Sequence, residues 1–209
     1  MIDRLIFALY AFFSIFPLLV LSKLNFFKVF AMSDSGYTIR RAVPSDAEVS
    51  CKLTSDTFVE TFGHMYPPED LAAYLADSYT VEKQLALIED PECAMWLLFE
   101  NSTGAAVGHA LAGPCGLPHA EARPEVDGEV RRLYVLKAHQ NGGHGRKLMT
   151  AAMEWLLASG PRVLWLGVWS ENLGAQRFYE RYGFKKAGEY EFPVGKIRDH
   201  EFIFRRVAN

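Results

Sequence analysis

The chain has 209 residues, half of them hydrophobic, and a formal net charge of −3. This length and apolar content predict one domain with a substantial core. The three cysteines, Cys51, Cys93 and Cys115, are odd in number and lack CxxC spacing, which argues against a disulfide framework and for a reducing compartment. The six histidines form no HExxH or Cys/His ligand set, so we expect no bound metal.

Residues 5–21 form an apolar run that is interrupted only by Ser14 and Pro17 and is followed by Lys23 and Lys28. Its length is at the lower limit for a membrane span, which needs about 17–25 residues. No clear small-x-small cleavage site follows the run, which argues against a signal peptide. The run therefore predicts either a membrane contact or a segment without a structural role.

Residues 1–31, the hydrophobic leader, accordingly have two interpretations. If they insert into a membrane, the flanking lysine and arginine side chains keep the following domain on the cytoplasmic side. Alternatively, the native chain begins at Met32, immediately before the first expected strand, and this interpretation is favoured. We expect a cytoplasmic protein, with the cytoplasmic face of the membrane as the alternative.

The first part of the domain predicts one strand and three helices. The strand covers Tyr37–Val43, and Ser45 with Glu48 forms a capping box that opens the first helix. Proline at position 67 separates this helix from a short second one, and Thr80 caps the third.

Two strands and a long loop follow these helices. The strands cover Ala94–Glu100 and Ala105–Ala112, and a polar turn joins them as a hairpin. The stretch Pro114–Asp127 contains three prolines and predicts a loop.

Residues 129–149 form an apolar strand, a short polar turn and three glycines that open a helix, with the sequence EVRRLYVLKAHQNGGHGRKLM. Gly142, Gly143 and Gly145 have no Cβ, so peptide N–H groups can come close to a ligand there. The start of a helix offers about four unsatisfied N–H groups and a partial positive charge, and both suit a phosphate. The segment therefore predicts an anion-binding turn.

The glycine spacing distinguishes three phosphate-binding motifs. The Walker loop needs four residues between its glycines followed by Gly-Lys-Ser/Thr, and the chain has no such run. The dinucleotide motif needs a third glycine where the chain has Leu148. The stretch Gln140-Asn141-Gly142-Gly143-His144-Gly145 fits Gln/Arg-x-x-Gly-x-Gly/Ala instead. It resembles the turn that holds the CoA pyrophosphate in the GNAT superfamily of acetyl-CoA-dependent N-acetyltransferases, and a tight turn without a ligand is the alternative.

A second motif, in residues 163–184, reads VLWLGVWSENLGAQRFYERYGF. It predicts a buried strand over Val163–Val168, a helix that starts near Asn172 and a stop at Gly183. Asn172 and Tyr179 are seven residues apart, so they project from nearly the same side of that helix. The run resembles the second GNAT motif, which contributes an asparagine and a tyrosine to the acetyl-CoA site.

The end of the chain completes the resemblance. Phe184–Phe192 and Asp199–Val207 predict a closing antiparallel pair of strands. The resemblance covers residues 37–207, which we expect to form the N-acetyltransferase domain. It implies the GNAT fold, an α/β (α+β) arrangement in which a mixed, mostly antiparallel sheet of six to seven strands is flanked by helices.

The resemblance also implies which residues bind the co-substrate, acetyl-CoA. The backbone of Leu133, Tyr134 and Val135 pairs with the pantetheine arm and polarises the thioester carbonyl. Asn172 forms a hydrogen bond with the cofactor or orients it. The pyrophosphate is held by the turn and the start of its helix, namely Gln140, Asn141, Gly142, Gly143, His144, Gly145 and Arg146.

Charge is distributed unevenly along the domain. Residues 33–100 contain 13 Asp and Glu against 4 Lys and Arg, whereas residues 101–209 contain 15 Lys and Arg against 11 Asp and Glu. The first part favours a cation and the second a polyanionic cofactor. Five basic residues crowd the proposed phosphate turn in sequence: Arg131, Arg132, Lys137, Arg146 and Lys147.

Acetyl transfer from a thioester to an amine requires two proton transfers. An alkylammonium ion with a pKa of about 10.4 must lose a proton, at a cost of about 4–5 kcal/mol at neutral pH, and the departing thiolate benefits from gaining one. Glu129 lies eleven residues before Gln140, as does the general base of the histone-type GNAT enzymes, and Tyr179 matches the family's acid. An ordered water in place of Glu129 stays open, and the other candidate bases are Glu125, Asp127 and His109.

The family binds its acceptor between the N-terminal helices and the sheet. In that region aromatic residues (Phe58, Phe62, Tyr66 and Tyr74) are interleaved with acids (Asp56, Glu60, Glu69, Asp70 and Asp77). Such a surface suits an elongated aliphatic cation, and the pattern looks like that of bacterial spermine/spermidine acetyltransferases. We therefore expect a small, polyamine-like amine as acceptor.

Two other functions stay open. The first alternative is an N-acetyltransferase whose acceptor is a protein or peptide amine. The second is a regulatory module that binds acyl-CoA without catalysing a reaction. A nucleic-acid partner is not expected, because no aromatic stacking platform accompanies the basic residues. The sequence leaves the oligomeric state open between a monomer and a homodimer.

Overall fold

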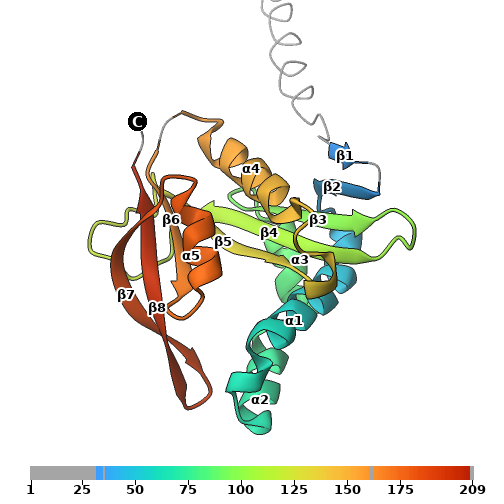
Figure 1. Ribbon diagram of the computed structural model, residues 1–209, viewed down its shortest axis with the longest axis horizontal. Coiled ribbons are helices and arrows are strands. Elements are labelled where there is room, and N and C mark those ends of the chain that lie inside the picture. Colours follow the sequence, from blue (N-terminus) through green and yellow to red (C-terminus); the bar gives the residue numbers. More distant parts are fainter. Residues whose placement is uncertain (1–31, 35, 161, 208–209) are drawn as a thin grey trace, which may run out of the picture. The chain divides into compact units, whose positions relative to one another are not determined.

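The computed structural model describes residues 32–34, 36–160 and 162–207, which belong to one compact unit (Figure 1). The predictions made for the leader, including its membrane contact, lie outside the described residues. In the part of the chain that is described, no helix is long and apolar enough to cross a membrane.

Eight strands, five α-helices and three short 3-10 helices make up the described unit. In chain order they are β1 (Met32–Asp34), β2 (Tyr37–Arg41), η1 (Pro44–Asp46), α1 (Ala47–Phe62), η2 (Gly63–Met65), α2 (Pro68–Ser78), α3 (Val81–Glu89), β3 (Ala94–Glu100), β4 (Ala106–Pro114), β5 (Gly128–Val135), η3 (Lys137–His139), α4 (His144–Leu157), β6 (Leu164–Trp169), α5 (Leu173–Glu180), β7 (Lys185–Val194) and β8 (Ile197–Arg206).

The strands form a single sheet in the order β1-β2-β3-β4-β5-β6-β8-β7. All neighbouring strands are antiparallel except β5 and β6, which run parallel. The predicted mixed, mostly antiparallel sheet is confirmed: seven strands match the expectation, and the three-residue β1 adds an edge strand that the sequence pattern did not indicate.

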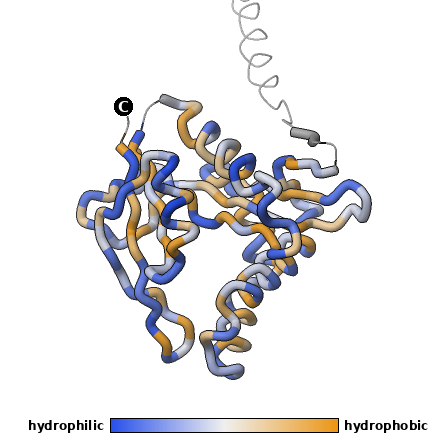
Figure 2. Tube along the Cα trace, in the orientation of Figure 1, coloured by the Kyte–Doolittle hydropathy of each residue, from blue (hydrophilic) through white to orange (hydrophobic). Residues whose placement is uncertain are grey.

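Both faces of the sheet are covered, and β3 shows why its sequence is apolar throughout. Trp96 and Leu98 pack into the core beneath α4, whereas Met95 and Leu97 pack into the core beneath α1 and α3. Successive side chains of a strand point to opposite faces, so a strand covered on both sides carries no polar alternation. Figures 1 and 2 show α4 on one side of β3–β5, α1 and α3 on the other, and a hydrophilic turn between β3 and β4.

One predicted helix cap is wrong. Ser45 lies within η1, and the N-cap of α1 is Asp46, whose carboxylate makes no cap hydrogen bond. That carboxylate instead accepts a hydrogen bond from the Val43 amide at 2.8 Å and pairs with Arg40 at 2.6 Å. A proline immediately before Ser45 favours a tight turn there, so the helix begins one residue later than the capping-box pattern suggests.

Strands β5 and β6 separate soon after they begin. They pair only at Gly128 with Leu164 and at Glu129 with Trp165. Farther along, β5 remains paired with β4 on one edge, and its other edge has no strand partner among the described residues. This divergence opens the sheet beside the first turn of α4.

Candidate functional site

The turn before α4 is held in a fixed conformation by its backbone and one side chain. Gly143 is the N-cap of α4 with φ of 77°, and Asn141 also has positive φ, at 63°. Glycine takes such a conformation without steric cost, and asparagine tolerates it better than most residues. The Gln140 side-chain amide donates to the Val135 carbonyl at 2.9 Å, which fastens the turn to the end of β5.

The start of α4 offers an open binding surface for an anion. No side chain caps the helix, so its first N–H groups are directed out of the helix end. A Cβ added at Gly145 would meet nothing within 4 Å, which leaves space directly above these groups. A phosphate group fits this surface, because it accepts from several N–H groups and is stabilised by the helix dipole.

A cleft of about 670 Å³, which we call the turn cleft, runs between β5, the start of α4, the end of β6 and α5. Every residue predicted to bind the co-substrate lines this cleft except Gly142. These residues are Leu133, Tyr134, Val135, Gln140, Asn141, Gly143, His144, Gly145, Arg146 and Asn172. The cleft follows the unpaired edge of β5, where an extended ligand with amide groups finds free main-chain partners.

Helix α5 brings Asn172 and Tyr179 to the same cleft. Asn172 is the N-cap, and its side-chain oxygen accepts from the Ala175 amide at 3.0 Å. Tyr179 is buried, and its hydroxyl has no hydrogen-bond partner among the described residues. Burial, and then the charge of Glu201, raises the pKa of Tyr179, so its phenol keeps its proton at neutral pH.

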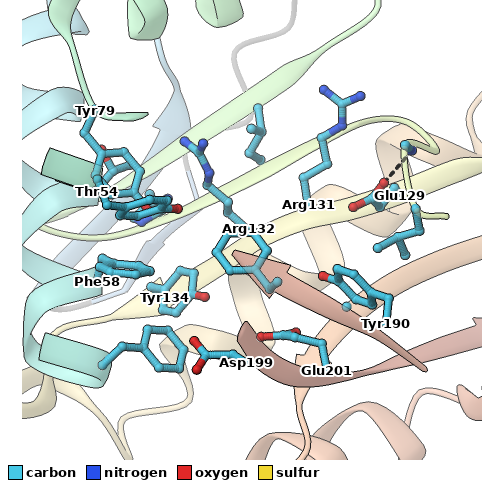
Figure 3. Close-up of a pocket in the computed structure, with 18 of the residues that line it drawn as sticks. Thr54, Phe58, Tyr79, Glu129, Arg131, Arg132, Tyr134, Tyr190, Asp199 and Glu201 are labelled. Atoms are coloured by element: carbon cyan, nitrogen blue, oxygen red, sulfur yellow. Dashed lines mark hydrogen bonds between the residues drawn. The ribbon is translucent and has the colours of Figure 1, made fainter. Parts of the chain in front are cut away.

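A second cavity, of about 400 Å³, lies on the α1 side of β5, and we call it the acid–aromatic cavity (Figure 3). Its aromatic walls come from segments far apart in the sequence: Phe58, Phe62, Tyr66, Tyr74, Tyr79, Tyr134, Tyr190 and Phe192. Its carboxylates are Glu129, Asp199 and Glu201, and two arginines, Arg131 and Arg132, also line it. The turn cleft and the acid–aromatic cavity share part of their walls, namely Phe62, Arg131, Arg132, Tyr134, Gly167 and Glu201.

Glu201 and Asp199 lie on one face of β8 at the floor of the acid–aromatic cavity (Figure 3). The Tyr66 hydroxyl donates a hydrogen bond to the Asp199 carboxylate. Burial, and then the neighbouring Asp199, raises the pKa of Glu201 to about 7. A Cβ added at Gly167 would lie only 3.5 Å from a Glu201 carboxylate oxygen, so the glycine leaves room beside this carboxylate.

Glu129, the predicted base, lines the acid–aromatic cavity but not the turn cleft. Its carboxylate accepts a hydrogen bond from the Gly116 amide at 2.7 Å, and burial raises its pKa. Of the other candidate bases, Asp127 is occupied by the Trp165 indole N–H at 2.9 Å. His109 stays neutral, because burial and then Arg132 lower its pKa to about 3. Glu125 is exposed and lines neither cavity.

The structure corrects two expectations about charge. Arg131 and Arg132 line the acid–aromatic cavity as well as the turn cleft, and their guanidinium groups contact the Pro114 carbonyl and the Tyr79 ring. The acids of the N-terminal helices (Asp56, Glu60, Glu69, Asp70 and Asp77) line neither cavity. Asp56 and Asp77 instead pair with nearby lysines.

Sequence reasoning overlooked Asp199 and Glu201. They are two residues apart on a strand, so both side chains point to the same face, and Ile203 continues that face into the core. Two acids on a half-buried strand face are a signal that a site lies there.

A parallel strand pair that diverges beside a glycine-rich helix start suits a ligand with a phosphate group and an extended, amide-bearing arm, and the second cavity offers room for another reactant. In the described part of the chain, no group of three potential metal ligands is present. The sequence model of the Acetyltransferase (GNAT) family matches residues 55–184, so the chain belongs to this family. It is therefore an acyltransferase of the N-acetyltransferase class, with acetyl-CoA as co-substrate.

Relatives agree with this membership. A protein of Lactobacillus delbrueckii subsp. lactis, described as an uncharacterized N-acetyltransferase, is 28% identical over 173 residues, which are 83% of this chain and 98% of that protein. A protein of Bacillus subtilis subsp. natto named "Probable spermine N(1)-acetyltransferase" is 27% identical over 139 residues, or 62% of this chain and 91% of that protein.

Solved structures share the fold. PaiA N-acetyltransferase from Thermoplasma acidophilum in complex with coenzyme A superposes with a TM-score of 0.64 at 19% identity, over 82% of this chain and 98% of that one. YncA from Salmonella typhimurium with its cofactor acetyl-CoA gives a TM-score of 0.63 at 19% identity, over 84% of this chain and 95% of that one.

Proposed function

We propose that the protein transfers the acetyl group of acetyl-CoA directly to a small primary amine bound in the acid–aromatic cavity. The observation that carries this proposal is the wall shared by the two cavities. A thioester that enters along the unpaired edge of β5 and an amine from the opposite side would meet there, next to Glu201. Both reactants would be held in one orientation, which supplies a large part of the rate enhancement in such reactions.

The reaction needs one bond formed and one broken. The lone pair of the neutral amine attacks the thioester carbonyl carbon, the new C–N bond forms, and the C–S bond breaks. The amine nitrogen loses a proton to a carboxylate, and the CoA sulfur gains a proton from an acid. Backbone N–H groups of β5 near Val135 would polarise the carbonyl during the attack.

Glu201 is the carboxylate that we propose as the base. It lines both cavities. Because its pKa is about 7, a large fraction of the molecules carry Glu201 as a carboxylate at neutral pH, and this form can take up the proton of the amine and release it afterwards. Glu129 stays the prediction from sequence, but it lines one cavity only and already accepts a hydrogen bond from Gly116. The two assignments differ in which variant loses the pH dependence of the rate.

Tyr179 is the acid that we propose for the leaving thiolate. It lines the turn cleft, and its raised pKa keeps it protonated. Direct transfer, rather than transfer through a covalent acetyl-cysteine, is supported by the state of Cys115. Cys115 is buried, lines neither cavity, and has a thiol whose pKa is raised to about 11 by burial.

A polyamine-like acceptor stays a prediction. It is supported by the aromatic walls, by Asp199 and Glu201, and by the similarity to the Bacillus protein named as a probable spermine N(1)-acetyltransferase. A protein or peptide amine is less well supported, because the cavity is bounded by side chains from α1, α2, β7 and β8 and has a volume of only about 400 Å³. We expect the enzyme to act in the cytoplasm, where acetyl-CoA is available.

The proposal is tested by the release of free thiol from acetyl-CoA in the presence of a panel of primary amines. Tyr179→Phe should lower kcat by about 10²- to 10⁴-fold and leave the Kd for CoA nearly unchanged. Tyr182→Phe, two residues beyond the end of α5 and outside both cavities, is the matched control and should retain activity. If CoA binds but no amine accelerates thiol release, the protein is a regulatory acyl-CoA-binding module instead.

A further inference from the structure

A bulge in β5 turns Arg132 toward the acid–aromatic cavity. Opposite β4, Leu111 pairs with Arg132 and Ala112 pairs with Val130, so Arg131 has no partner in the register. Such a bulge shifts the alternation of side chains between the two faces. Val130 consequently packs into the core beneath α4, whereas Arg132 lines the acid–aromatic cavity.

The Arg132 guanidinium has no hydrogen-bonding partner in the described part of the chain. Its Nη1 atom is buried and forms no hydrogen bond. Its recorded contact is with the face of the Tyr79 ring, whose centroid lies 5.3 Å from Cζ. The nearby His109 cannot offset the charge of Arg132, because an imidazole is either neutral or cationic, and burial and then Arg132 lower its pKa to about 3. Arg132 as a whole is half-buried, but a buried N–H donor that is left unsatisfied is costly, and Nη1 is in this position.

The neighbouring arginine is different. The Arg131 guanidinium donates two hydrogen bonds to the Pro114 carbonyl, at 3.2 Å from Nε and 3.0 Å from Nη2. The chain therefore satisfies one of two adjacent arginines with its own backbone and leaves the other directed at the cavity. This contrast indicates that the partner of Arg132 comes from outside the chain.

The carboxylates lie at another part of the same cavity. Figure 3 shows Asp199 and Glu201 side by side at its floor, with the Arg132 guanidinium directed away from them toward Tyr79. No ion pair joins Arg132 to either carboxylate. The cavity thus has an anionic end and a cationic end, with aromatic side chains between them.

We infer that the acceptor amine also carries a carboxylate, as amino acids do. Its amino group would lie beside Glu201 and Asp199, its carboxylate would pair with Arg132, and its hydrocarbon part would contact the aromatic walls. Arginine and carboxylate form strong, often bidentate, charge-assisted hydrogen bonds. A polyamine would instead bring a second cation toward Arg132, which is unfavourable. This inference rests on the proposed function and specifies its substrate class.

The test compares acceptors that differ only in the carboxylate. Full-length protein is assayed for thiol release with amino-carboxylates of increasing chain length, with the matching amines that lack the carboxylate, and with spermidine. We expect the best amino-carboxylate to exceed its matching amine by about 10-fold or more in kcat/KM. Arg132→Met should raise the KM for that amino-carboxylate by about 10- to 100-fold and change the KM for the matching amine by less than about 3-fold.

Two further variants separate charge from folding. Arg132→Lys keeps a cation and should recover part of the affinity for the amino-carboxylate. Arg177→Met makes the same chemical change as Arg132→Met on the exposed side of α5, outside both cavities, and should leave all acceptors unaffected. A loss of both acceptor types in Arg132→Met, with a lowered Tm, would show a structural role and overturn the inference.

Failure of the inference is distinguishable from failure of the proposed function. Efficient acetylation of spermidine or of the plain amines, without turnover of amino-carboxylates, would overturn the inference and keep the acetyltransferase. If no acceptor is turned over, calorimetry with the CoA-loaded protein decides. Binding of an amino-carboxylate that is lost in Arg132→Met supports the inference, and absence of such binding overturns it.

Discussion

The turn cleft and the acid–aromatic cavity adjoin each other but are built in different ways. Most residues of the turn cleft come from two contiguous stretches, β5 with the start of α4, and the end of β6 with α5, and its phosphate-binding part is the main chain of the turn. The acid–aromatic cavity is made from side chains of α1, α2, β4, β5, β7 and β8. A cleft that binds its ligand through the backbone can be recognised in the sequence by its glycine motif. A cavity made of side chains from distant segments has no such motif.

This difference also separates the binding of the cofactor, which depends on the main chain, from the choice of acceptor, which depends on side chains. The main-chain geometry of the turn cleft suits a phosphate-bearing ligand whatever the acceptor, since it depends on Gly143 and on an uncapped helix start. In the acid–aromatic cavity, one substitution at Arg132 or Glu201 changes the charge that an acceptor meets. Specificity for the acceptor therefore resides in the side-chain cavity, and the variants below are compared by their separate effects on acceptor turnover and on CoA binding.

The largest effect is expected from Gly145→Glu in the turn cleft. The added side chain would fill the open space above the start of α4 and bring a carboxylate to the expected phosphate position. Repulsion of this kind costs several kcal/mol, so the Kd for CoA should rise by about 100-fold or more. Calorimetry measures this change. Gly36→Glu, at an equally open glycine outside both cavities, is the control and should bind CoA normally.

The next effect concerns Glu201 and the pH dependence of the rate. Its carboxylate form accepts the proton, so kcat/KM should rise with pH through about 7 and level off above it. Glu201→Gln should lower the rate by about 100-fold and remove this rise, with CoA binding retained. Glu129→Gln should keep the rise, and its disappearance in that variant would assign the base to Glu129 instead.

Glu201 also makes a prediction about stability that needs no substrate. Its pKa in the folded protein, about 7, exceeds the ordinary value of 4.5, so between these values the folded state binds more protons than the unfolded state. The stabilisation is complete below pH 4.5 and is lost as pH rises to about 7. Denaturant titrations of the wild type against Glu201→Gln should show the variant relatively more stable at pH 8 than at pH 5. Parallel curves would contradict the raised pKa.

A smaller effect is expected from Gly167→Ala, which crowds the Tyr190 side of the wall that the two cavities share. The new Cβ would lie 2.8 Å from the Tyr190 hydroxyl, so this side chain must move. Overpacking of this kind costs about 1–3 kcal/mol, and the KM for the acceptor should rise by about 10-fold while the Kd for CoA stays within about 2-fold. Adding Tyr190→Phe removes the clashing oxygen and should recover part of the loss. An unchanged KM would mean that the acceptor does not reach β6.

The smallest effect is that of Asn172→Ala on folding. Asn172 accepts a hydrogen bond from Ala175 at the start of α5, and loss of such a cap costs about 1 kcal/mol. Chemical denaturation should show this decrease. A rise in the Kd for CoA beyond what the lost cap explains would indicate that Asn172 also touches the cofactor.

The fold was largely predictable from the sequence because its elements are long and their periodicities are clear. The two-sided burial of β3 gives a continuous apolar run, and the hairpin that follows it has turn residues at its tip. The prediction of the helix cap failed because polar groups compete locally. Asp46 is held by Arg40 and Val43, and the Ser45 cap does not form. β1 is too short to show a pattern.

The candidate site divides in the same way. The residues that line the turn cleft could be named from two motifs, each carried by neighbouring positions. Glu201 could not be linked to the site, because no sequence spacing reports that β8 passes beside β6 at Trp169. The acids of the N-terminal helices were wrongly expected in the site. They are close in sequence to the aromatic residues that line the cavity, but their own side chains line neither cavity.

The unpaired edge of β5 has a consequence for handling the protein. A strand with free main-chain groups is a template onto which another chain can add, and this is a common start of aggregation. A pantetheine arm lying along that edge would occupy the template. We therefore expect concentrated preparations to self-associate less when CoA is present, so that the co-substrate protects the chain that consumes it.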